Sequence, residues 1–405
     1  MRTILDPNLK DTRRGAIAEE ALRACVHCGM CNATCPTYQL TGDEMEGPRG
    51  RIYLMKQVLE GAAPSRLTQE HLDSCLSCRA CETTCPSGVS YHRLFDIGQE
   101  AVVAAVPRPL FERLLREAIR RVTISPALFS HLASLARTFR PLLPGALRGK
   151  IPAAVPVGLR PAQRHARTML MLTGCVQSAI AGHFNATTAR IFDRVGISLI
   201  EVREAGCCGA VSAHLDARDA ARTQARKNLD AWGTFLDQDV EALIVNSSGC
   251  ATFLRDYPDL LGDDPHYLPR AQRLAGLVRD PLEVLETLAL VPIRAPRQAR
   301  IAVHEPCTLQ HGLKLTGRIA QLLARLGYDP QPVADNHLCC GSAGSYSLLQ
   351  PKMAGRLKKA KLKALNASAP DIIFTGNIGC WMHLSDDAPV PVRHWLEAVD
   401  AVTAP

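Results

Sequence analysis

Short apolar runs alternate with longer amphipathic stretches in the C-terminal half of the chain. The runs, each of five or six residues, comprise 168–172, 197–202, 241–246, 300–304 and 371–375. Such runs predict buried strands. Helical spacing fills the stretches between them, for example 212–232 and 347–365. Because strands that alternate with helices favour a parallel sheet, we expect two equivalent α/β half-domains that face each other.

The segment from residue 108 to residue 164 has a different pattern. Helical spacing is present near 110–122 and 127–140, and prolines interrupt it afterwards. The segment holds eleven Lys and Arg but only two Asp and Glu, and this balance of +9 exceeds the +8 of the whole chain. We interpret it as a linker with one or two basic amphipathic helices. The basic segment suits peripheral attachment to an anionic membrane. The alternative is that its arginines are solvated or contact an acidic partner subunit.

The overall composition is that of a globular protein. The chain has 405 residues, 47% hydrophobic and 21% charged, which predicts two or three domains. A net charge of +8 does not by itself indicate nucleic-acid binding, and no zinc-finger, homeodomain or RNP motif is present. The chain has no run of about 18 uncharged apolar residues, and its first twenty residues carry charges throughout. We therefore expect a cytoplasmic protein with neither a membrane span nor a secretory signal.

All sixteen cysteines belong to two internal repeats. In the first repeat, Cys25, Cys28, Cys31 and Cys35 recur 50 residues later as Cys75, Cys78, Cys81 and Cys85. In the second, Cys175, Cys207, Cys208 and Cys250 recur 130 to 132 residues later as Cys307, Cys339, Cys340 and Cys380. In a cytoplasmic protein, clustered cysteines are metal ligands or redox groups more often than crosslinks.

The first repeat has the spacing C-x2-C-x2-C-x3-C-P. In bacterial ferredoxins, three cysteines of this run hold one [4Fe–4S] cluster and the fourth ligates the other cluster. The two-residue gaps turn three thiolates toward one face of a cluster, and the proline ends the turn. We therefore predict one cluster on Cys25, Cys28, Cys31 and Cys85, and a second on Cys35, Cys75, Cys78 and Cys81.

A structural zinc site is the alternative for these eight cysteines. Zinc usually takes two C-x2-C pairs, whereas each run here has a third and a fourth cysteine and the whole run is duplicated. We interpret His27, which lies between two predicted ligands, as a spacer. Arg49 and Arg51, between the two runs, either tune a cluster potential or only hold their loop.

The second repeat reads C-x31-C-C-G, followed after about forty residues by G-C. Adjacent cysteines do not suit a tetrahedral zinc site, and a disulfide between them is strained. The pattern resembles the cysteine-rich CCG domains of the heterodisulfide reductase, anaerobic glycerol-3-phosphate dehydrogenase and glycolate oxidase families. With a ferredoxin-type pair before it, nearly the whole chain looks most like the iron–sulfur subunits of glycolate oxidase (glycolate dehydrogenase).

The resemblance implies an α/β protein with a small, mainly helical ferredoxin domain and two homologous α/β CCG half-domains. The expected boundaries are 1–107 for the two-[4Fe–4S] domain, 108–164 for the linker, 165–292 for the first CCG domain and 293–405 for the second.

The chain departs from the superfamily pattern, which ends each CCG domain with C-x2-C. The fifth thiolate is replaced by Phe253 in the first copy and by His383 in the second. Imidazole replaces thiolate in some iron–sulfur centres, but a phenyl ring does not ligate iron. One interpretation is a third cluster on Cys307, Cys339, Cys340 and Cys380, with the first copy less able to hold one. The other is that all eight CCG cysteines are inert small hydrophobic residues.

The sequence carries neither the G-x-G-x-x-G run of dinucleotide-binding folds nor a P-loop. Oxidation of a 2-hydroxy acid removes two electrons as a hydride equivalent, whereas each cubane passes one electron, so a partner must carry a flavin or nicotinamide. The resemblance implies flavin (FAD) subunits that oxidise glycolate to glyoxylate. This chain would then supply no catalytic residue, and would carry electrons toward a quinone or another acceptor at the inner face of the cytoplasmic membrane.

Three alternatives remain open. The first is the equivalent subunit of a D-lactate or glycerol-3-phosphate dehydrogenase. The second is a subunit like that of heterodisulfide reductase, in which the CCG cysteines are catalytic. The third is a zinc scaffold without redox function.

Overall fold

The protein is described from a computed structural model, which covers residues 1–139, 154–288, 290–294, 296 and 299–404. Its chain forms two units, which consist of residues 1–116 with 337–361 and of residues 117–336 with 362–405. Two helices, α8 (Leu110–Ile124) and α22 (Pro351–Asn366), run from one unit into the other. The predicted linker lies partly outside the described residues, at 140–153.

The first unit is built from short helices. Its elements are α1 (Pro7–Lys10), α2 (Arg13–Ala24), η1 (Met30–Thr34), α3 (Pro36–Thr41), η2 (Glu44–Glu46), α4 (Pro48–Leu59), α5 (Arg66–Asp73), α6 (Ala80–Thr84), α7 (Tyr91–Ala105) and α21 (Tyr346–Leu349). Prolines occupy the first position of α3 and of α4, where a missing N–H costs nothing. The mainly helical character expected for the N-terminal domain is confirmed.

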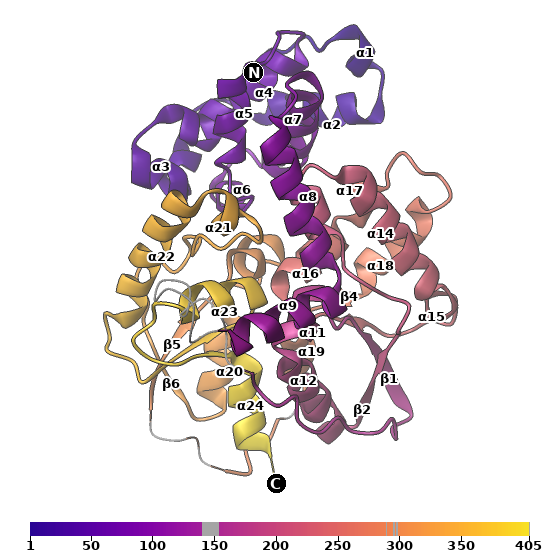
Figure 1. The fold of residues 1–405 in the computed structure, drawn as a ribbon, viewed down its shortest axis with the longest axis vertical. Helices are drawn as coiled ribbons and strands as arrows, with labels where there is room; N and C mark the ends of the chain where they lie inside the picture. The colour runs from indigo at the N-terminus through magenta and orange to yellow at the C-terminus, as the bar shows by residue number, and fades with distance from the viewer. Residues whose placement is uncertain (140–153, 289, 295, 297–298, 405) are drawn as a thin grey trace. The chain divides into compact units, whose positions relative to one another are not determined.

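The core of the first unit lies between α2, α4 and α7 (Figure 1). Leu22, Met55 and Leu94, one from each helix, are fully buried, and each contributes roughly 1.5–3 kcal/mol by leaving water. Gly98 lets α7 approach α4, because a Cβ atom there would lie 2.5 Å from the Met55 side chain. Cys25 and Cys81 are part of the same buried cluster, so the core extends to the cysteine-bearing loops.

The second unit contains two parallel four-stranded sheets. One has the order β2-β1-β3-β4 and the other the order β6-β5-β7-β8. The strands are β1 (Arg167–Met171), β2 (Ile197–Glu201), β3 (Leu243–Ile244), β4 (Val278–Arg279), β5 (Arg300–His304), β6 (Asp329–Gln331), β7 (Ile372–Thr375) and β8 (Val392–His394). The same strand order in both sheets is the structural counterpart of the sequence repeat and confirms the two predicted α/β domains.

Helices surround the two sheets. They are α9 (Pro126–Thr138), α11 (Cys175–Ile180), α12 (Gly182–Arg194), α13 (Ala210–His214), α14 (Arg218–Ala231), α15 (Gly233–Asp237), α16 (Ser248–Arg255), α17 (Tyr257–Leu260), α18 (Leu268–Leu277), α19 (Pro281–Leu285), η4 (Thr308–Gly312), α20 (Arg318–Arg325), α23 (Ile378–Ser385) and α24 (Trp395–Thr403). Among the described residues, no helix combines the length and apolarity that crossing a bilayer requires.

The two sheets share one continuous hydrophobic core, to which Trp232 from the first CCG domain and Trp395 from the second both belong. Hydrogen bonds connect the two domains at the ends of β3, β7 and β8. His394 Nε2 lies 3.0 Å from the carbonyl oxygen of Asn246, and Ser247 Oγ lies 2.8 Å from Asn377 Oδ1. The second unit is therefore a single packed body in which the two copies support each other.

Candidate functional site

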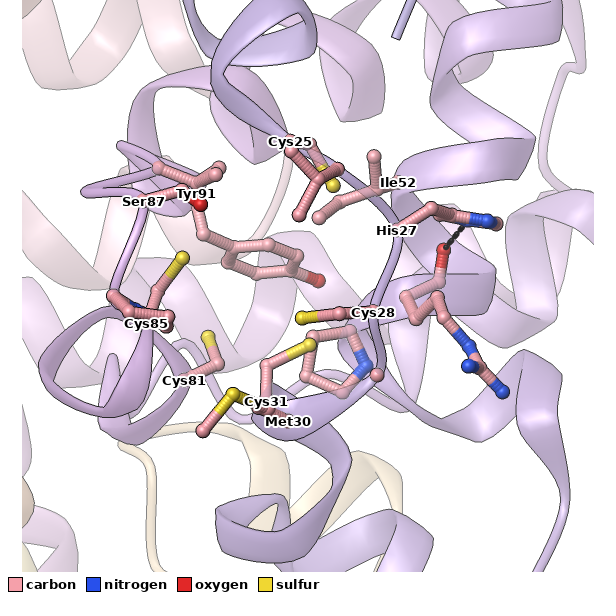
Figure 2. Close-up of a pocket in the computed structure, with 16 residues that line it drawn as sticks. Cys25, His27, Cys28, Met30, Cys31, Ile52, Cys81, Cys85, Ser87 and Tyr91 are labelled. Carbon is pink, nitrogen blue, oxygen red and sulfur yellow. Dashed lines mark hydrogen bonds between the residues drawn. The ribbon is translucent and has the colours of Figure 1, made fainter.

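Two neighbouring pockets in the first unit collect the cysteines of the first repeat. The first cysteine pocket is lined by Cys25, Cys28, Cys31 and Cys85 (Figure 2). The second cysteine pocket is lined by Cys35, Cys75 and Cys78. Cys81 lines both pockets. Each early triplet therefore lines a pocket together with the last cysteine of the other run, and the crossed ligand sets themselves stay a prediction.

The backbone repeats as closely as the sequence does. His27 and Ser77 have φ values of 60° and 49°, and the residues two positions later, Gly29 and Arg79, have φ values of 83° and 61°. These left-handed residues wrap each C-x2-C-x2-C loop, so that its cysteines face one pocket. Two of these four residues, His27 and Arg79, have larger side chains than the Gly, Asn or Asp that usually adopt the left-handed conformation. Backbone strain of this kind often occurs at functional sites.

The two cysteine pockets adjoin each other. Besides Cys81, they share Pro48 and Tyr91 as lining residues. The two runs also meet at a pair of equivalent threonines, because the Thr84 hydroxyl donates a hydrogen bond of 3.1 Å to Thr34 Oγ1. Redox groups held in the two pockets would therefore be close neighbours within one unit.

The cysteine thiols sit in an environment that disfavours free charge. Burial raises the pKa of Cys31 to about 11, and the neighbouring Cys25 adds to the shift. Burial likewise raises the pKa of Cys81 well above its ordinary value. At neutral pH these thiols hold their protons unless a metal ion replaces them, so metal binding would release protons.

A buried cation lies beside the second cysteine pocket. Arg51 is only 1% exposed, and its guanidinium donates to the carbonyl oxygen of His71 (2.8 Å), to Thr37 Oγ1 (3.1 Å) and to Glu46 Oε2 (2.8 Å). Thr37 in turn lies 3.2 Å from the Cys35 sulfur. The charge of Arg51 is thus fixed next to a predicted ligand, away from water.

The arginine beside the first cysteine pocket is more exposed to solvent than Arg51. Arg49 lines this pocket, but its side chain is 34% exposed and is paired with Glu44 through contacts of 2.6 and 2.9 Å. His27 Nε2 lies 3.3 Å from the carbonyl oxygen of Arg49, so the imidazole is tied to the loop. The two arginines therefore differ sharply in their exposure to solvent.

The first CCG copy brings its four cysteines together in the second unit. The Cys175 thiol contacts Cys207, Cys207 contacts Cys208, and Cys208 contacts Cys250. For Cys207, the hydrogen bond from Cys175 lowers the pKa, but the bond to Cys208 and burial outweigh it and raise the pKa to about 12. Gly209 ends this turn with a φ of 98°, which only glycine adopts easily.

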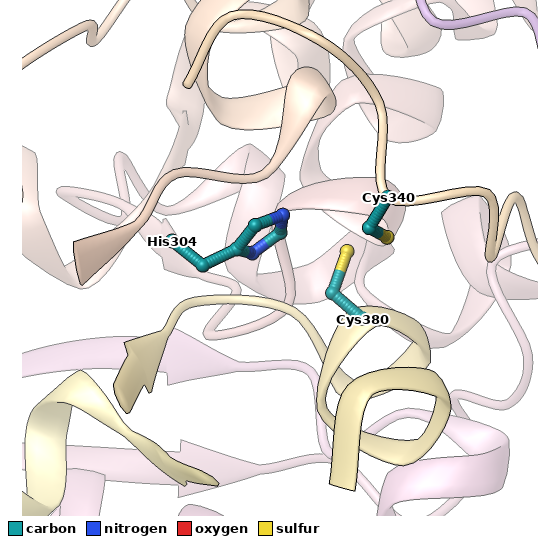
Figure 3. A group of neighbouring side chains, drawn as sticks. All are labelled: His304, Cys340 and Cys380. Carbon is teal, nitrogen blue, oxygen red and sulfur yellow. The ribbon is translucent and has the colours of Figure 1, made fainter. Parts of the chain in front are cut away.

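The four cysteines of the second CCG copy are divided between the two units. Cys307 and Cys380 belong to the second unit, where the Cys380 sulfur lies within 4.8 Å of a His304 ring nitrogen (Figure 3). Cys339 and Cys340 belong to the first unit. The third cluster predicted for these four cysteines stays a prediction.

The stretch 337–361, which carries the second CCG turn, joins the rest of the first unit through specific bonds. Tyr346 donates its hydroxyl to the carbonyl oxygen of Ser74 (3.1 Å), the residue before Cys75. Arg356 Nη2 donates to the carbonyl oxygen of Leu40 (2.6 Å). The second CCG turn is therefore held within the unit that carries both cysteine pockets.

Sequence reasoning did not identify two residues of this site. Tyr91 lines both cysteine pockets, and its hydroxyl lies 3.6 Å from the Cys75 sulfur. The other is Thr37, which links Cys35 to Arg51. Thr37 follows the C-P pair of the first run, whereas the equivalent residue after the second run is Ser87, so comparison of the two runs would have drawn attention to this position.

Comparison with known proteins agrees with this organisation. Residues 21–89 match the 4Fe-4S dicluster domain family, and residues 169–255 and 301–385 match the cysteine-rich domain family. The chain is 48% identical over 401 residues to the glycolate oxidase iron-sulfur subunit of Escherichia coli (strain K12), which covers 99% of this chain and 98% of that protein. It is 28% identical to the probable glycolate oxidase iron-sulfur subunit of Bacillus subtilis (strain 168), with 90% and 89% covered. Lactate utilization protein A of an Exiguobacterium species is 22% identical, with 56% and 94% covered.

Proposed function

Because the chain belongs to the family of glycolate oxidase iron–sulfur subunits, we propose that it carries electrons from a flavin-containing partner that oxidises glycolate. The electrons pass onward to a quinone or another acceptor. The observation that carries this proposal is the pair of adjoining cysteine pockets in the first unit. The proposal makes the chain the electron-transfer part of an oxidoreductase, with substrate oxidation on another subunit.

In this proposal each cysteine pocket holds one [4Fe–4S] cluster. The first is held by Cys25, Cys28, Cys31 and Cys85, and the second by Cys35, Cys75, Cys78 and Cys81. Such clusters accept and release one electron at a time. The described residues contribute the thiolate ligands, the apolar walls that exclude water, and the fixed charge of Arg51 beside the second pocket.

The two pockets differ in their access to the surface. Cys28 is exposed, whereas Cys35 and Cys81 are buried. An exposed ligand offers a short path for exchange with another protein, so we place electron exchange with the partner subunit at the first cysteine pocket. The buried cation favours the reduced, more negative state of a centre in the second pocket, and electrons should therefore collect there.

The cysteine substitutions test this function directly. Cys28→Ser and Cys78→Ser, each introduced into the assembled complex, should abolish glycolate-dependent reduction of a distal acceptor while glycolate still bleaches the partner's flavin. Ser87→Ala is the matched control, because Ser87 lines the first pocket but has no thiol, and it should keep full turnover. Full turnover in Cys28→Ser or in Cys78→Ser would exclude the proposal.

D-lactate is the alternative substrate of the complex. The relatives named lactate utilization protein A match about half of this chain at 20–25% identity, far below the similarity to the glycolate oxidase subunits. The purified complex should bleach its clusters with glycolate at a rate well above that with D-lactate. A faster reaction with D-lactate would assign the chain to the other substrate.

We also propose that α8 attaches the protein to an anionic membrane surface. Leu110, Phe111 and Leu114 are 61–76% exposed on this helix, which is unusual for large apolar side chains in such close succession. Several arginines nearby are already paired within the chain, for example Arg108 with Asp73 at 2.6 Å, so apolar burial rather than charge would supply most of the binding.

Co-sedimentation of the assembled complex with phosphatidylcholine–phosphatidylglycerol vesicles tests this attachment. Phe111→Glu should lower the bound fraction several-fold, whereas Leu159→Glu, an exposed apolar position outside α8, should leave it unchanged. Equal binding of Phe111→Glu and the unaltered complex would exclude α8 as the attachment site.

A further inference from the structure

The helix α22 carries a row of exposed cations. Its sixteen residues include six Lys and Arg but no Asp or Glu. Lys352, Arg356 and Lys359 are exposed, belong to the first unit and are spaced four and three residues apart, so they share one face of the helix. We call these three residues the basic stripe. Like charges at this spacing destabilise a helix, so helix formation itself does not account for the stripe.

The charge of the basic stripe is not neutralised by the described part of the chain. Lys352 and Lys359 take part in no ion pair among the described residues. Arg356 donates a hydrogen bond of 2.6 Å to the carbonyl oxygen of Leu40, which leaves its positive charge in place. The stripe therefore presents a positive potential to solvent, and such a potential attracts a negatively charged surface.

The opposite face of α22 packs on the second CCG turn. Gly341 has a φ of 90°, and a Cβ atom there would lie 2.8 Å from both the carbonyl oxygen of Ala354 and the Cβ atom of Leu357. Ala354 and Leu357 are at most 4% exposed. The helix thus lies directly on the turn that carries Cys339 and Cys340, with the basic stripe on its solvent side.

The bond from Arg356 connects the basic stripe to a second element that carries a redox cysteine. Its acceptor, Leu40, lies in α3, which begins at Pro36, directly after Cys35. Cys35 lines the second cysteine pocket. A molecule bound at the stripe would therefore be held against elements that position cysteines of the first unit.

The residues of α22 indicate the kind of surface that the basic stripe fits. All three leucines of the helix, Leu357, Leu362 and Leu365, are at most 7% exposed. A helix that binds a bilayer surface needs large apolar side chains that are free to enter it, as on α8. Exposed charges without such anchors are typical of protein interfaces that steer a partner of opposite charge. The stripe therefore fits an acidic protein surface better than a membrane.

We propose that the basic stripe binds an acidic face of the flavin-containing partner subunit. This inference rests on the proposed function, in which that partner delivers electrons to the first unit. The stripe and the first cysteine pocket belong to the same unit, so contact at the stripe would hold the partner on the unit that receives its electrons. The positive charges would also accelerate the approach of the acidic partner.

Cross-linking of the assembled complex tests this contact without any substitution. A water-soluble carbodiimide joins a lysine amine to a touching carboxylate as an amide, with loss of water, and mass spectrometry identifies the joined residues. Lys352 or Lys359 should be joined to an Asp or Glu of the partner subunit. Lys10, an exposed lysine on α1 of the same unit, is the internal control and should give no such product. Absence of a product with the partner at both Lys352 and Lys359 would overturn the proposal.

Charge reversal tests the energetic part of the proposal. The variant that combines Lys352→Glu with Lys359→Glu is compared with one that combines Arg2→Glu with Lys10→Glu, exposed positions of the same unit with the same change of charge. At low ionic strength the Kd of the full, iron-loaded chain for the purified partner should rise about ten-fold or more in the first variant and less than about two-fold in the second. The difference should shrink in about 0.5 M sodium chloride, because salt screens exposed charges. Equal Kd values for the unaltered chain and the first variant would overturn the proposal.

Two parallel measurements separate this proposal from the others. The variant with both α22 substitutions should keep the iron content and the reduced-state electron paramagnetic resonance signal of the unaltered chain. Absence of clusters from the unaltered chain would refute the proposed function, whereas unchanged partner binding by a chain with clusters would refute the docking alone. Reduced binding to phosphatidylcholine–phosphatidylglycerol vesicles with unchanged partner binding would assign the stripe to the membrane and overturn the proposal.

Discussion

The two cysteine repeats occupy different kinds of structure. The eight cysteines before residue 86 lie in loops and single helical turns, wrapped by left-handed residues, in a unit without strands among its described residues. The first CCG copy instead places its cysteines at the ends of parallel strands above a large shared core. Cysteines contribute to the core of both units: Cys25 and Cys81 belong to the core of the first unit, and Cys208 belongs to the much larger core of the second.

This difference indicates which interactions stabilise each unit. The loops that carry the first repeat are supported by no sheet among the described residues, so a bound metal would supply part of the folding free energy of the first unit. A parallel sheet that is covered by helices and packed on a continuous apolar core is stable without a bound metal. We therefore expect the first unit to depend on iron and the second unit to be largely independent of it.

Iron removal should produce the largest contrast between the units. After anaerobic chelation, amide protons between residues 25 and 91 should exchange about 100-fold faster or more, because the loops lose their ligand. All three tryptophans (Trp232, Trp381 and Trp395) belong to the second unit, so the wavelength of their emission maximum should not change. A tryptophan shift that accompanies iron loss would show that both units depend on the metal.

Replacement of Arg51 should produce the next largest effect. Arg51→Met removes a buried charge and leaves the Glu46 carboxylate without its guanidinium partner, although its contact to His71 remains, at a cost of about 3 kcal/mol to the first unit. It should also lower the reduction potential of the centre in the second cysteine pocket, because a nearby cation stabilises the reduced form. Redox titration followed by electron paramagnetic resonance measures this shift.

Arg49→Met is the control for that replacement. Arg49 is one-third exposed, so water screens its charge and its potential shift should be clearly smaller. Equal shifts in the two variants would contradict the distinction between the buried and the open arginine.

Acid should weaken the second unit through His394. Burial lowers the pKa of His394 to about 3, from an ordinary value of about 6.5. Below pH 6.5 the imidazole of His394 is protonated in the unfolded chain but stays neutral in the folded unit. The contribution of this histidine to the free energy of unfolding is therefore fully present above pH 6.5 and is lost as the pH falls toward 3. His394 by itself should contribute a slope of about 1.4 kcal/mol per pH unit, and His183, whose pKa burial lowers to about 4, adds to the total slope. Urea unfolding followed by tryptophan emission measures it between pH 6.5 and 4.5.

The variant His394→Asn should flatten this pH dependence, because asparagine also accepts a bond at a helix N-terminus but does not titrate. His131→Asn, an exposed position on α9, should leave the slope unchanged. An equally steep slope in His394→Asn would assign the acid sensitivity to another group.

Much of the scaffold was predictable from the sequence. The apolar runs located β1, β2, β3, β5 and β7 to within about two residues, and the alternation with helices predicted the parallel sheets. The strands β4, β6 and β8 were not predicted, because two or three residues at a sheet edge leave no periodic signal. The predicted helix 212–232 is divided into α13 and α14, with Asp216 in a left-handed conformation between them.

The site was predictable where the sequence spacing itself dictates geometry. Each C-x2-C-x2-C loop needs only its own residues to face one pocket, and its repetition indicated two pockets. The burial of the Arg51 side chain was not predictable, because it depends on hydrogen bonds to Glu46, Thr37 and His71. These residues lie up to 20 positions away along the chain. The contacts among the four thiols of the first CCG copy follow from strand order, which local patterns do not specify.

Electron paramagnetic resonance of the reduced, anaerobically purified chain tests the central claim most directly. The two cysteine pockets share three lining residues, so two reduced [4Fe–4S] clusters should give a spectrum broadened by their magnetic interaction. Cys78→Ser should remove one cluster and leave the narrower signal of a single, isolated cluster. An absence of any cluster signal in the unaltered protein, or an unchanged interacting spectrum in Cys78→Ser, would contradict the assignment of the two pockets.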